Sequence, residues 1–243
     1  MAKRTKDPNY DNPPKTLEGH IFYGLQLDED QQRFRDAIWN DDVEIVFVDA
    51  KAGSGKTTIA VATSVMAVKY KKYDEIYYVM HSVGDAQGFL PGTISEKSSV
   101  WFEPLYQALI EAGEVPDQVI KNSSMTAQKE GMAYITAITD SYLRGSNISG
   151  REKGAILIVD EAQNYDEFSL RKVLTRACEG TKVIVIGHRM QCDLPSSKRS
   201  GFEACMNHFR AKGDRRVAFC ELTTNHRSWV ANVADEPWNE RSE

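Results

Sequence analysis

Ala50-Lys51-Ala52-Gly53-Ser54-Gly55-Lys56-Thr57 follows directly on the apolar, β-branched run Val43–Asp49 and leads into a helix-forming stretch up to about Lys69. A strand, a glycine turn and a helix in this order are typical of the Walker A phosphate loop. The glycines let the backbone curl so that its N–H groups converge on phosphate oxygens, and the helix aims its positive N-terminus at the same anion. The stretch therefore predicts a phosphate-binding loop, although Ala50 stands where the motif usually has its first glycine.

The residue types of this loop indicate which part of a nucleoside triphosphate each would contact. Lys56 can span the β- and γ-phosphates, and the Thr57 hydroxyl can ligate Mg²⁺. We therefore expect ATP and Mg²⁺ as cofactors. The predicted nucleotide-binding residues of the loop are Gly53, Ser54, Gly55, Lys56, Thr57 and Thr58.

A second motif is the apolar run Ile156–Val159, which ends in Asp160 and Glu161 as a Walker B strand does. Asp160 would hold Mg²⁺ through water, and Glu161 would orient and deprotonate the attacking water. A glutamate next to the metal-binding aspartate favours hydrolysis over phosphoryl transfer to a metabolite. A small-molecule kinase is the disfavoured alternative, since the sequence has no arginine-rich lid.

A third apolar run, Val183–Gly187, precedes a loop that contains Gln191. In an ATPase such a polar residue can sense the γ-phosphate and couple hydrolysis to motion. The alternative is an ordinary surface glutamine.

Strands alternate with helices along most of the chain. This alternation predicts a RecA-like P-loop α/β fold: a mostly parallel sheet, helices on both faces, and function at the carboxyl ends of the strands. We expect residues 1–20 to form a flexible or loosely docked tail and residues 21–243 to form a single ATPase domain. The expected strands are 43–49, 75–80, 134–139, 155–160, 183–187 and 217–222, and the expected helices are 28–40, 56–69, 100–111, 168–176 and 201–209.

Composition excludes several classes of protein. Hydrophobic residues make up 41% and charged residues 27% of the chain, which is ordinary for a globular protein. No apolar run approaches the roughly 18 residues of a membrane span, and no apolar stretch follows the basic N-terminus as in a secretory signal. The four cysteines stand singly, so neither a zinc site nor a disulfide framework is indicated. We expect a cytoplasmic protein with no membrane partner.

Further motifs resemble those of the PhoH-like family of ATPases, which are relatives of the superfamily 1 helicase core. The resemblance runs from about Gln31 to Arg227. It departs from the family at His188, where an aspartate is usual, and at His81, where relatives tend to have an arginine. The motifs are Gly88–Gly92 (G-F-L-P-G), Pro104–Leu109, Tyr142–Gly145, Asp160–Asn164 (D-E-A-Q-N), Leu174–Arg176, Asp193–Pro195 and Ser200-Gly201.

The resemblance implies roles for residues outside the phosphate loop. Leu222–Ser228 is similar to the N-Y-R-S element of superfamily 1 helicases. Arg227 would therefore reach the γ-phosphate of the nucleotide bound to the same chain. Gln31 stands where a glutamine contacts adenine in the helicase relatives. The alternative is that Gln31 is an ordinary residue on a helix surface. The family also implies a hexameric ring, in which Arg144 or Arg176 would complete the neighbouring subunit's site.

Two functions remain open from the sequence. One is a ring-forming helicase or translocase on single-stranded RNA or DNA, and the other is an ATPase that remodels or scaffolds a protein partner. The net charge of −5 means that any contact with nucleic acid needs a local basic patch. Clusters of basic residues also occur on protein surfaces that face solvent and bind nothing. Tyr70, Tyr73, Tyr77 and Tyr78 could stack on bases or pack strand against helix. The basic clusters are Lys69, Lys71 and Lys72; Lys198 and Arg199; and Arg210, Lys212, Arg215 and Arg216.

Overall fold

The computed structural model describes residues 10–17, 22–81, 102–121, 133–143, 145–194 and 199–234. Their strands form one sheet in the order β3-β2-β4-β5-β1-β6, and every neighbouring pair is parallel. The strands are β1 (Ile45–Ala50), β2 (Glu75–Met80), β3 (Ile135–Thr139), β4 (Ala155–Val159), β5 (Lys182–Gly187) and β6 (Val217–Leu222).

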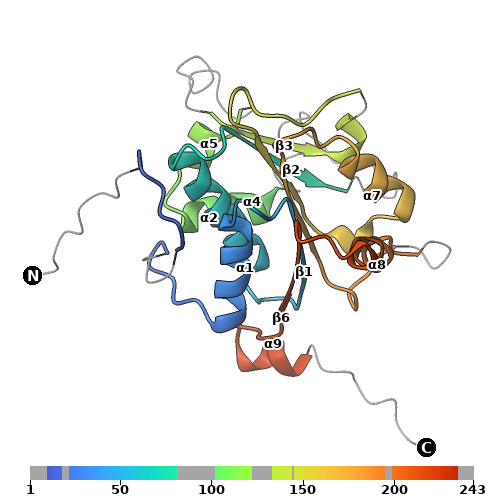
Figure 1. Cartoon of the computed structure of the whole chain (residues 1–243). Helices are drawn as coiled ribbons and strands as arrows, with labels where there is room; N and C mark the ends of the chain where they lie inside the picture. Colours follow the sequence, from blue (N-terminus) through green and yellow to red (C-terminus); the bar gives the residue numbers. More distant parts are fainter. Residues whose placement is uncertain are drawn as a thin grey trace, which may run out of the picture.

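Helices cover both faces of this sheet (Figure 1). On one face α1 (Glu29–Trp39), α2 (Lys56–Lys69) and α4 (Glu103–Glu111) pack around one apolar core, with α5 (Pro116–Val119) beside α4. On the other face α7 (Glu167–Leu174) and α8 (Phe202–Lys212) enclose a second core. The short helices η1 (Asp140–Leu143) and η2 (Ala162–Asn164) follow β3 and β4, and α9 (Trp229–Ala234) follows β6. The observed architecture confirms the predicted fold class.

The central strands form because their residues suit burial on both sides. All residues of β4 and β5 are buried, as expected for parallel strands covered by helices on each face. Helix α2 is buried from Ile59 to Ala67 without interruption, because it lies between the sheet, α1 and α4. The strand order places β5 between β1, which carries the phosphate loop, and β4, which carries the Walker B carboxylates. Three candidate motifs thus meet at one edge of the sheet.

Each predicted strand lies within two residues of an observed one, and each predicted helix within three. The short helices α5 and α9 were not predicted. Trp101 and the G-F-L-P-G loop lie outside the described residues.

Part of the predicted N-terminal tail packs on the domain. Leu17 is fully buried in the core that also contains Trp39 and Tyr70. Trp39 Nε1 donates to Pro14 O (3.0 Å), and the Tyr10 ring meets the Tyr70 ring edge-on at 5.0 Å. A buried apolar side chain, one hydrogen bond and one ring contact therefore hold residues 10–17 in place. Residues 1–9 and 18–21 lie outside the described residues.

Among the helices of the described residues, none is long and apolar enough to cross a membrane.

A buried lysine ties α1 to the sheet. Lys182 Nζ, at the start of β5, donates to Ile38 O (2.8 Å) and Asn40 O (2.5 Å), two carbonyls at the C-terminus of α1. Burial, and to a lesser extent the charge of Lys72, lowers the pKa of Lys182 to about 8. The two hydrogen bonds offset part of the free energy needed to bury the amine.

Lys182→Met keeps most of the side-chain volume but leaves both carbonyls without this donor. We expect the free energy of unfolding at pH 7 to fall by about 1–3 kcal/mol, the usual cost of an unsatisfied buried polar group. Urea unfolding measures this, with the exposed Lys212→Met as control. Equal unfolding midpoints for both variants would refute the proposed role of Lys182.

Candidate nucleotide site

The loop between β1 and α2 has the geometry of an anion cradle. Gly53 (φ +75°) and Gly55 (φ +77°) are both left-handed, a conformation that glycine adopts without steric cost. Gly55 is the N-cap residue of α2, and no side chain caps this helix end. The first N–H groups of α2 therefore have no side-chain acceptor, and the positive end of a 14-residue helix faces the loop.

Asp160, at the carboxyl end of β4, is fixed by three hydrogen bonds. Its Oδ2 accepts from Thr57 Oγ1 (2.8 Å) and from the hydroxyl of Tyr78 (2.6 Å), and its Oδ1 accepts from the N–H of Glu161 (2.8 Å). The Thr57 hydroxyl and the Asp160 carboxylate thus lie side by side, as predicted for a shared Mg²⁺. Both are oxygen ligands, which Mg²⁺ prefers, and the ion usually takes one or two protein oxygens together with substrate phosphates. The pair fits the ion.

Tyr78 is a member of the site that its sequence context did not reveal. It is completely buried in β2, so the stacking of bases on this ring is excluded. Burial, then the charge of Asp160 and the hydrogen bond to it, raise the pKa of Tyr78 well above its ordinary value. The hydroxyl therefore remains protonated and remains a donor to Asp160.

Glu161 is held in a strained backbone conformation beside the loop lysine. Its φ of +50° is left-handed, which is uncommon for a residue with a β-carbon and is often found at functional sites. Its Oε1 lies 3.6 Å from Lys56 Nζ, and its Oε2 accepts from Gln163 Nε2 at 2.5 Å. The carboxylate thus faces the phosphate loop from the Walker B side.

Gln163 links the Walker B turn to the loop after β5. The side chain is almost fully buried, and its Oε1 accepts from the N–H of His188 at 3.0 Å. The other end of the same amide donates to Glu161. Sequence reasoning assigned no role to Gln163, and only its place in the D-E-A-Q-N motif could have signalled one.

The loop that contains Gln191 is also attached to β1. Asp49 Oδ1 accepts from the N–H of Arg189 at 3.1 Å and lies 3.6 Å from His188 Nδ1, and Asp49 Oδ2 accepts from Arg189 Nε. The N–H of Gln191 donates to His188 O at 3.2 Å. His188, one of the departures from the family pattern, therefore packs against a carboxylate of the strand that leads into the phosphate loop.

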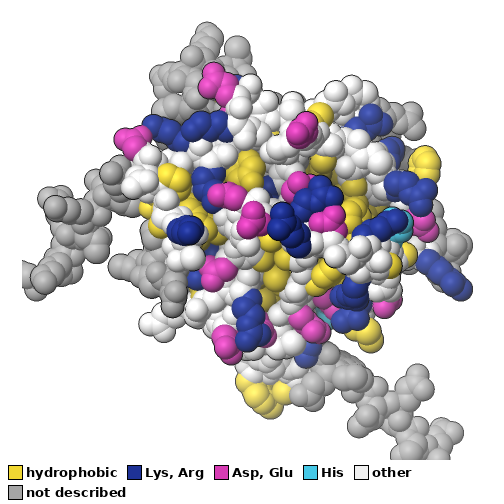
Figure 2. Space-filling view, viewed as in Figure 1, with side chains coloured by type: hydrophobic (Ala, Val, Ile, Leu, Met, Phe, Trp, Pro, Cys, Tyr) yellow, Lys and Arg dark blue, Asp and Glu magenta, His cyan; other side chains and the backbone are white. Residues whose placement is uncertain are grey.

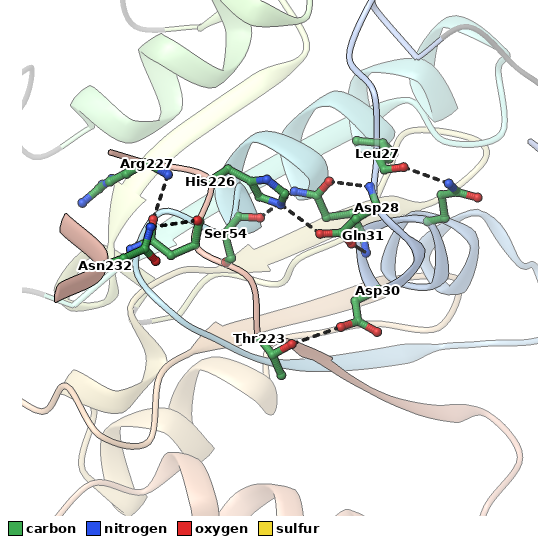
Figure 3. Close-up of polar contacts among 11 residues, drawn as sticks. Leu27, Asp28, Asp30, Gln31, Ser54, Thr223, His226, Arg227 and Asn232 are labelled. Carbon is green, nitrogen blue, oxygen red and sulfur yellow. Dashed lines mark hydrogen bonds and ion pairs between the residues drawn. The ribbon is translucent and has the colours of Figure 1, made fainter. Parts of the chain in front are cut away.

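The segment Thr223–Arg227, called here the C-terminal clasp, lies across the phosphate loop and the start of α1 (Figure 3). The N–H of His226 donates to Gly53 O at 3.0 Å, and His226 Nε2 lies 2.9 Å from Asp28 Oδ2. Thr223 Oγ1 donates to Asp30 Oδ2 at 3.4 Å. The clasp thus joins three elements that are far apart in the sequence.

Arg227 passes directly over Gly53. A β-carbon added at Gly53 would lie 2.3 Å from Asn225 Oδ1, 2.7 Å from Arg227 Cγ and 2.8 Å from Arg227 Cδ. Only glycine permits this close approach of the clasp. The role of Arg227 at the γ-phosphate stays a prediction.

The predicted roles of Gln31, Ser54 and Thr58 in nucleotide binding stay predictions. Gln31 Nε2 donates to Ser54 O (2.9 Å) and its Oε1 accepts from the N–H of Asp28 (3.0 Å), so here its amide ties the phosphate loop to α1. The Ser54 side chain is fully buried, whereas Thr58 lies in the first turn of α2 and is partly exposed.

Arg176 follows α7, which begins beside the Walker B turn and ends before β5 begins. It therefore lies toward the amino ends of the strands, away from its own phosphate loop. Arg144 lies outside the described residues.

The sequence profile of the family described as PhoH-like protein matches residues 26–232 of this chain. A PhoH-like protein of Mycobacterium tuberculosis (strain ATCC 25618 / H37Rv) is 36% identical over 196 residues, which cover 80% of this chain and 51% of that protein. A PhoH-like protein of Synechocystis is 34% identical over 213 residues, which cover 86% of this chain and 58% of that protein. The chain thus spans about half the length of the curated relatives that it matches.

Among solved structures, the fold is similar to that of the UvsW helicase from bacteriophage T4. The TM-score is 0.50 at 9% identity, and the match covers 81% of this chain and 60% of that one. At this identity the similarity concerns the fold alone.

Gly53→Ala should displace the clasp from the phosphate loop, because the new β-carbon would overlap Asn225 and Arg227. We expect nucleotide affinity, measured with a fluorescent ATP analogue, to fall at least tenfold. Gly113→Ala is the matched control, since Gly113 has a similar φ of +73° and nothing within 4 Å of the added carbon. That control should show only the cost of a left-handed alanine, about 1–2 kcal/mol of stability. Equal nucleotide affinities for both variants would contradict the clasp geometry.

Proposed function

The chain belongs to the PhoH-like protein family, and on that premise we propose that it hydrolyses ATP in a Mg²⁺-dependent reaction at the site between β1 and β4. One observation carries the proposal. The Glu161 carboxylate is held between Lys56 and Gln163, next to the paired oxygens of Thr57 and Asp160. A base, a cation for the phosphates and a pair of metal ligands thus face one glycine loop, as ATP hydrolysis requires.

In the proposed reaction, the loop N–H groups and the N-terminus of α2 bind the phosphates. Lys56 leaves its ion pair with Glu161 and pairs with the β- and γ-phosphates instead. The Glu161 carboxylate is then free to act as a base. Glu161 then accepts a proton from the attacking water as the new P–O bond forms and the bond to the ADP oxygen breaks. Mg²⁺, held by Thr57 and Asp160, would supply neutralising charge at the phosphate oxygens. Arg227 would stabilise the charge that develops in the transition state.

The loop after β5 would report the state of the γ-phosphate. Gln163 contacts Glu161 at one end and the backbone of His188 at the other, and Asp49 ties the same loop to β1. A change at the catalytic carboxylate is thus passed to the Gln191 loop through two hydrogen bonds. This connection supports a coupling of hydrolysis to motion, with Gln191 as the sensor.

We further propose that the chain forms a hexameric ring in which a neighbour donates an arginine to each site. Arg176 lies at the end of α7 away from its own phosphate loop, a position that suits action in trans. Arg144 remains the second candidate.

The motion would drive a helicase or translocase on single-stranded RNA or DNA. UvsW of bacteriophage T4, one of the solved structures with a similar fold, is itself a helicase. The described basic clusters differ in how free they are to bind a phosphate backbone. Lys69, Lys71 and Lys72 pair with Glu114, Asp11 and Asp41, so that cluster is largely neutralised.

Arg199, by contrast, is exposed a few residues beyond the Gln191 loop, and we take the Lys198-Arg199 pair as the contact to the strand. The alternative is an ATPase that remodels a protein partner without nucleic acid. The pairing of Lys69, Lys71 and Lys72 with carboxylates favours it, because these lysines are then not free to bind a phosphate backbone.

Glu161→Gln removes the base but keeps the size of the side chain. We expect nucleotide affinity to persist and hydrolysis to slow by orders of magnitude in a phosphate-release assay. Lys56→Ala should lower both nucleotide affinity and the rate of hydrolysis, because a cation at the phosphates is lost. The control Glu152→Gln, at an exposed position, should change neither quantity. Turnover near the wild-type rate in Glu161→Gln would refute the assignment of the base.

Binding to a single strand should weaken steeply as salt rises, because each neutralised phosphate releases counterions. Replacing Lys198 and Arg199 by alanine should reduce the slope of log Kd against log salt and leave basal hydrolysis nearly unchanged. Replacing Lys71 and Lys72 by alanine is the control and should leave the slope as it is. If neither RNA nor DNA binds at low salt with nucleotide present, the partner-remodelling ATPase becomes the better account.

A further inference from the structure

Tyr78 reaches the Walker B aspartate from the interior of the protein. It lies in β2, opposite Ile158 of β4, and is completely buried. Its ring packs in the core that α1, α2 and α4 cover, where it meets the Phe102 ring edge-on at 6.2 Å. Its hydroxyl donates to Asp160 Oδ2 at 2.6 Å. Because close packing determines the direction of the ring, the hydroxyl keeps a fixed position at this carboxylate.

This hydrogen bond limits how Asp160 can contact a cation. A carboxylate has two oxygens, with about four lone-pair sites in all. Oδ2 accepts from Tyr78 and from Thr57 Oγ1 (2.8 Å), so both of its sites are occupied. Oδ1 accepts from the N–H of Glu161 (2.8 Å), which leaves one site that no described residue fills. Asp160 therefore has a single lone pair for an ion, or for a water molecule bound to an ion.

The Thr57 hydroxyl remains able to bind a cation directly. A hydroxyl has one proton and two lone pairs, so Thr57 can donate to Asp160 and still offer an oxygen lone pair to a metal ion. Mg²⁺ suits such a pair, because it gives up its water ligands reluctantly and usually keeps several of them. Ca²⁺ takes more oxygen ligands and often binds both oxygens of one carboxylate. The hydrogen bonds at Oδ2 oppose this second kind of contact.

Surface charge cannot discriminate between the two ions. Mg²⁺ and Ca²⁺ have the same charge, and Figure 2 shows lysine and arginine side chains interspersed with aspartate and glutamate over the visible face. A preference for one ion must therefore come from the oxygens that the site offers.

We propose that Tyr78 determines the cation specificity of the site. By occupying Oδ2 it leaves Asp160 one lone pair, which suits a water molecule of a hydrated Mg²⁺ and opposes the two-oxygen contact of Ca²⁺. Tyr78 acts through Asp160 and is a positioning residue. The inference rests on the proposed function, since it concerns the cation of the proposed ATP site.

The test measures the affinity of a non-hydrolysable fluorescent ATP analogue with saturating Mg²⁺, with saturating Ca²⁺ and with EDTA. The cation preference is the ratio of the Kd in Ca²⁺ to the Kd in Mg²⁺. We expect the wild type to bind more tightly with Mg²⁺. Tyr78→Phe should lower the preference about tenfold, a usual effect of removing a hydrogen-bond partner of a metal ligand. The variant should fold, because it loses one oxygen atom and Thr57 still donates to Oδ2.

Tyr77→Phe is the matched control. Tyr77 precedes Tyr78 in β2 but packs against the core on the opposite face of the sheet, and its hydroxyl donates to Ser149 O at 3.4 Å. The same oxygen is thus removed from the same strand without a change at Asp160. The cation preference of this variant should equal that of the wild type.

Two results would overturn the role of Tyr78. One is an unchanged cation preference in Tyr78→Phe, with or without an equal loss of affinity in both ions, since a purely structural role predicts this. The other is a wild type that shows no preference for Mg²⁺, a result that needs no variant. The proposed ATP site would survive both if affinity with cation exceeds that with EDTA. Equal affinity in Mg²⁺, Ca²⁺ and EDTA would contradict the Mg²⁺ site and the role of Tyr78 together.

Discussion

The carboxylate of Asp160 fixes the geometry on which the rest of the site depends. It accepts hydrogen bonds from Thr57 of α2, from Tyr78 of β2 and from the N–H of Glu161. These three hydrogen bonds together fix its position. The sheet makes this possible, because parallel strands end at one edge and place their carboxyl-end residues beside the phosphate loop. Tyr78 is a buried donor with a strongly raised pKa, so this support does not change over the physiological pH range.

Two unusual features lie beside that fixed point. Glu161 adopts a left-handed backbone conformation, and Gly53 lets Asn225 and Arg227 approach closer than any β-carbon would allow. The strained conformation of Glu161 persists only where the surroundings determine it. Here Gln163 and Lys56 hold the glutamate from two sides, and the clasp holds the glycine loop.

The same contacts suggest how chemistry is connected to the surface. From Glu161, one route runs through Gln163 to the loop after β5. A second runs from Gly53 through His226 to the clasp and on to α9. The second route therefore connects the phosphate loop to the C-terminal helix α9.

Sequence predicted the strands well, because buried parallel strands are continuous β-branched runs such as Ala155–Val159. It also assigned Thr57 and Asp160 to one predicted Mg²⁺ site, and the structure brings these two side chains into contact. It did not reveal Tyr78 or Gln163 as members of the site, since the direction of a side chain depends on packing between elements distant in sequence. Helix α9 was missed because six residues are too few to show a period.

If ATP is hydrolysed at this edge of the sheet, as we propose, the wild-type chain must release phosphate from it. Release should be followed with Mg²⁺ or with EDTA, in the presence and absence of single-stranded RNA and DNA. We expect many phosphates per chain with Mg²⁺ and none with EDTA. ATP that binds with Mg²⁺ but is never hydrolysed under any of these conditions would contradict it.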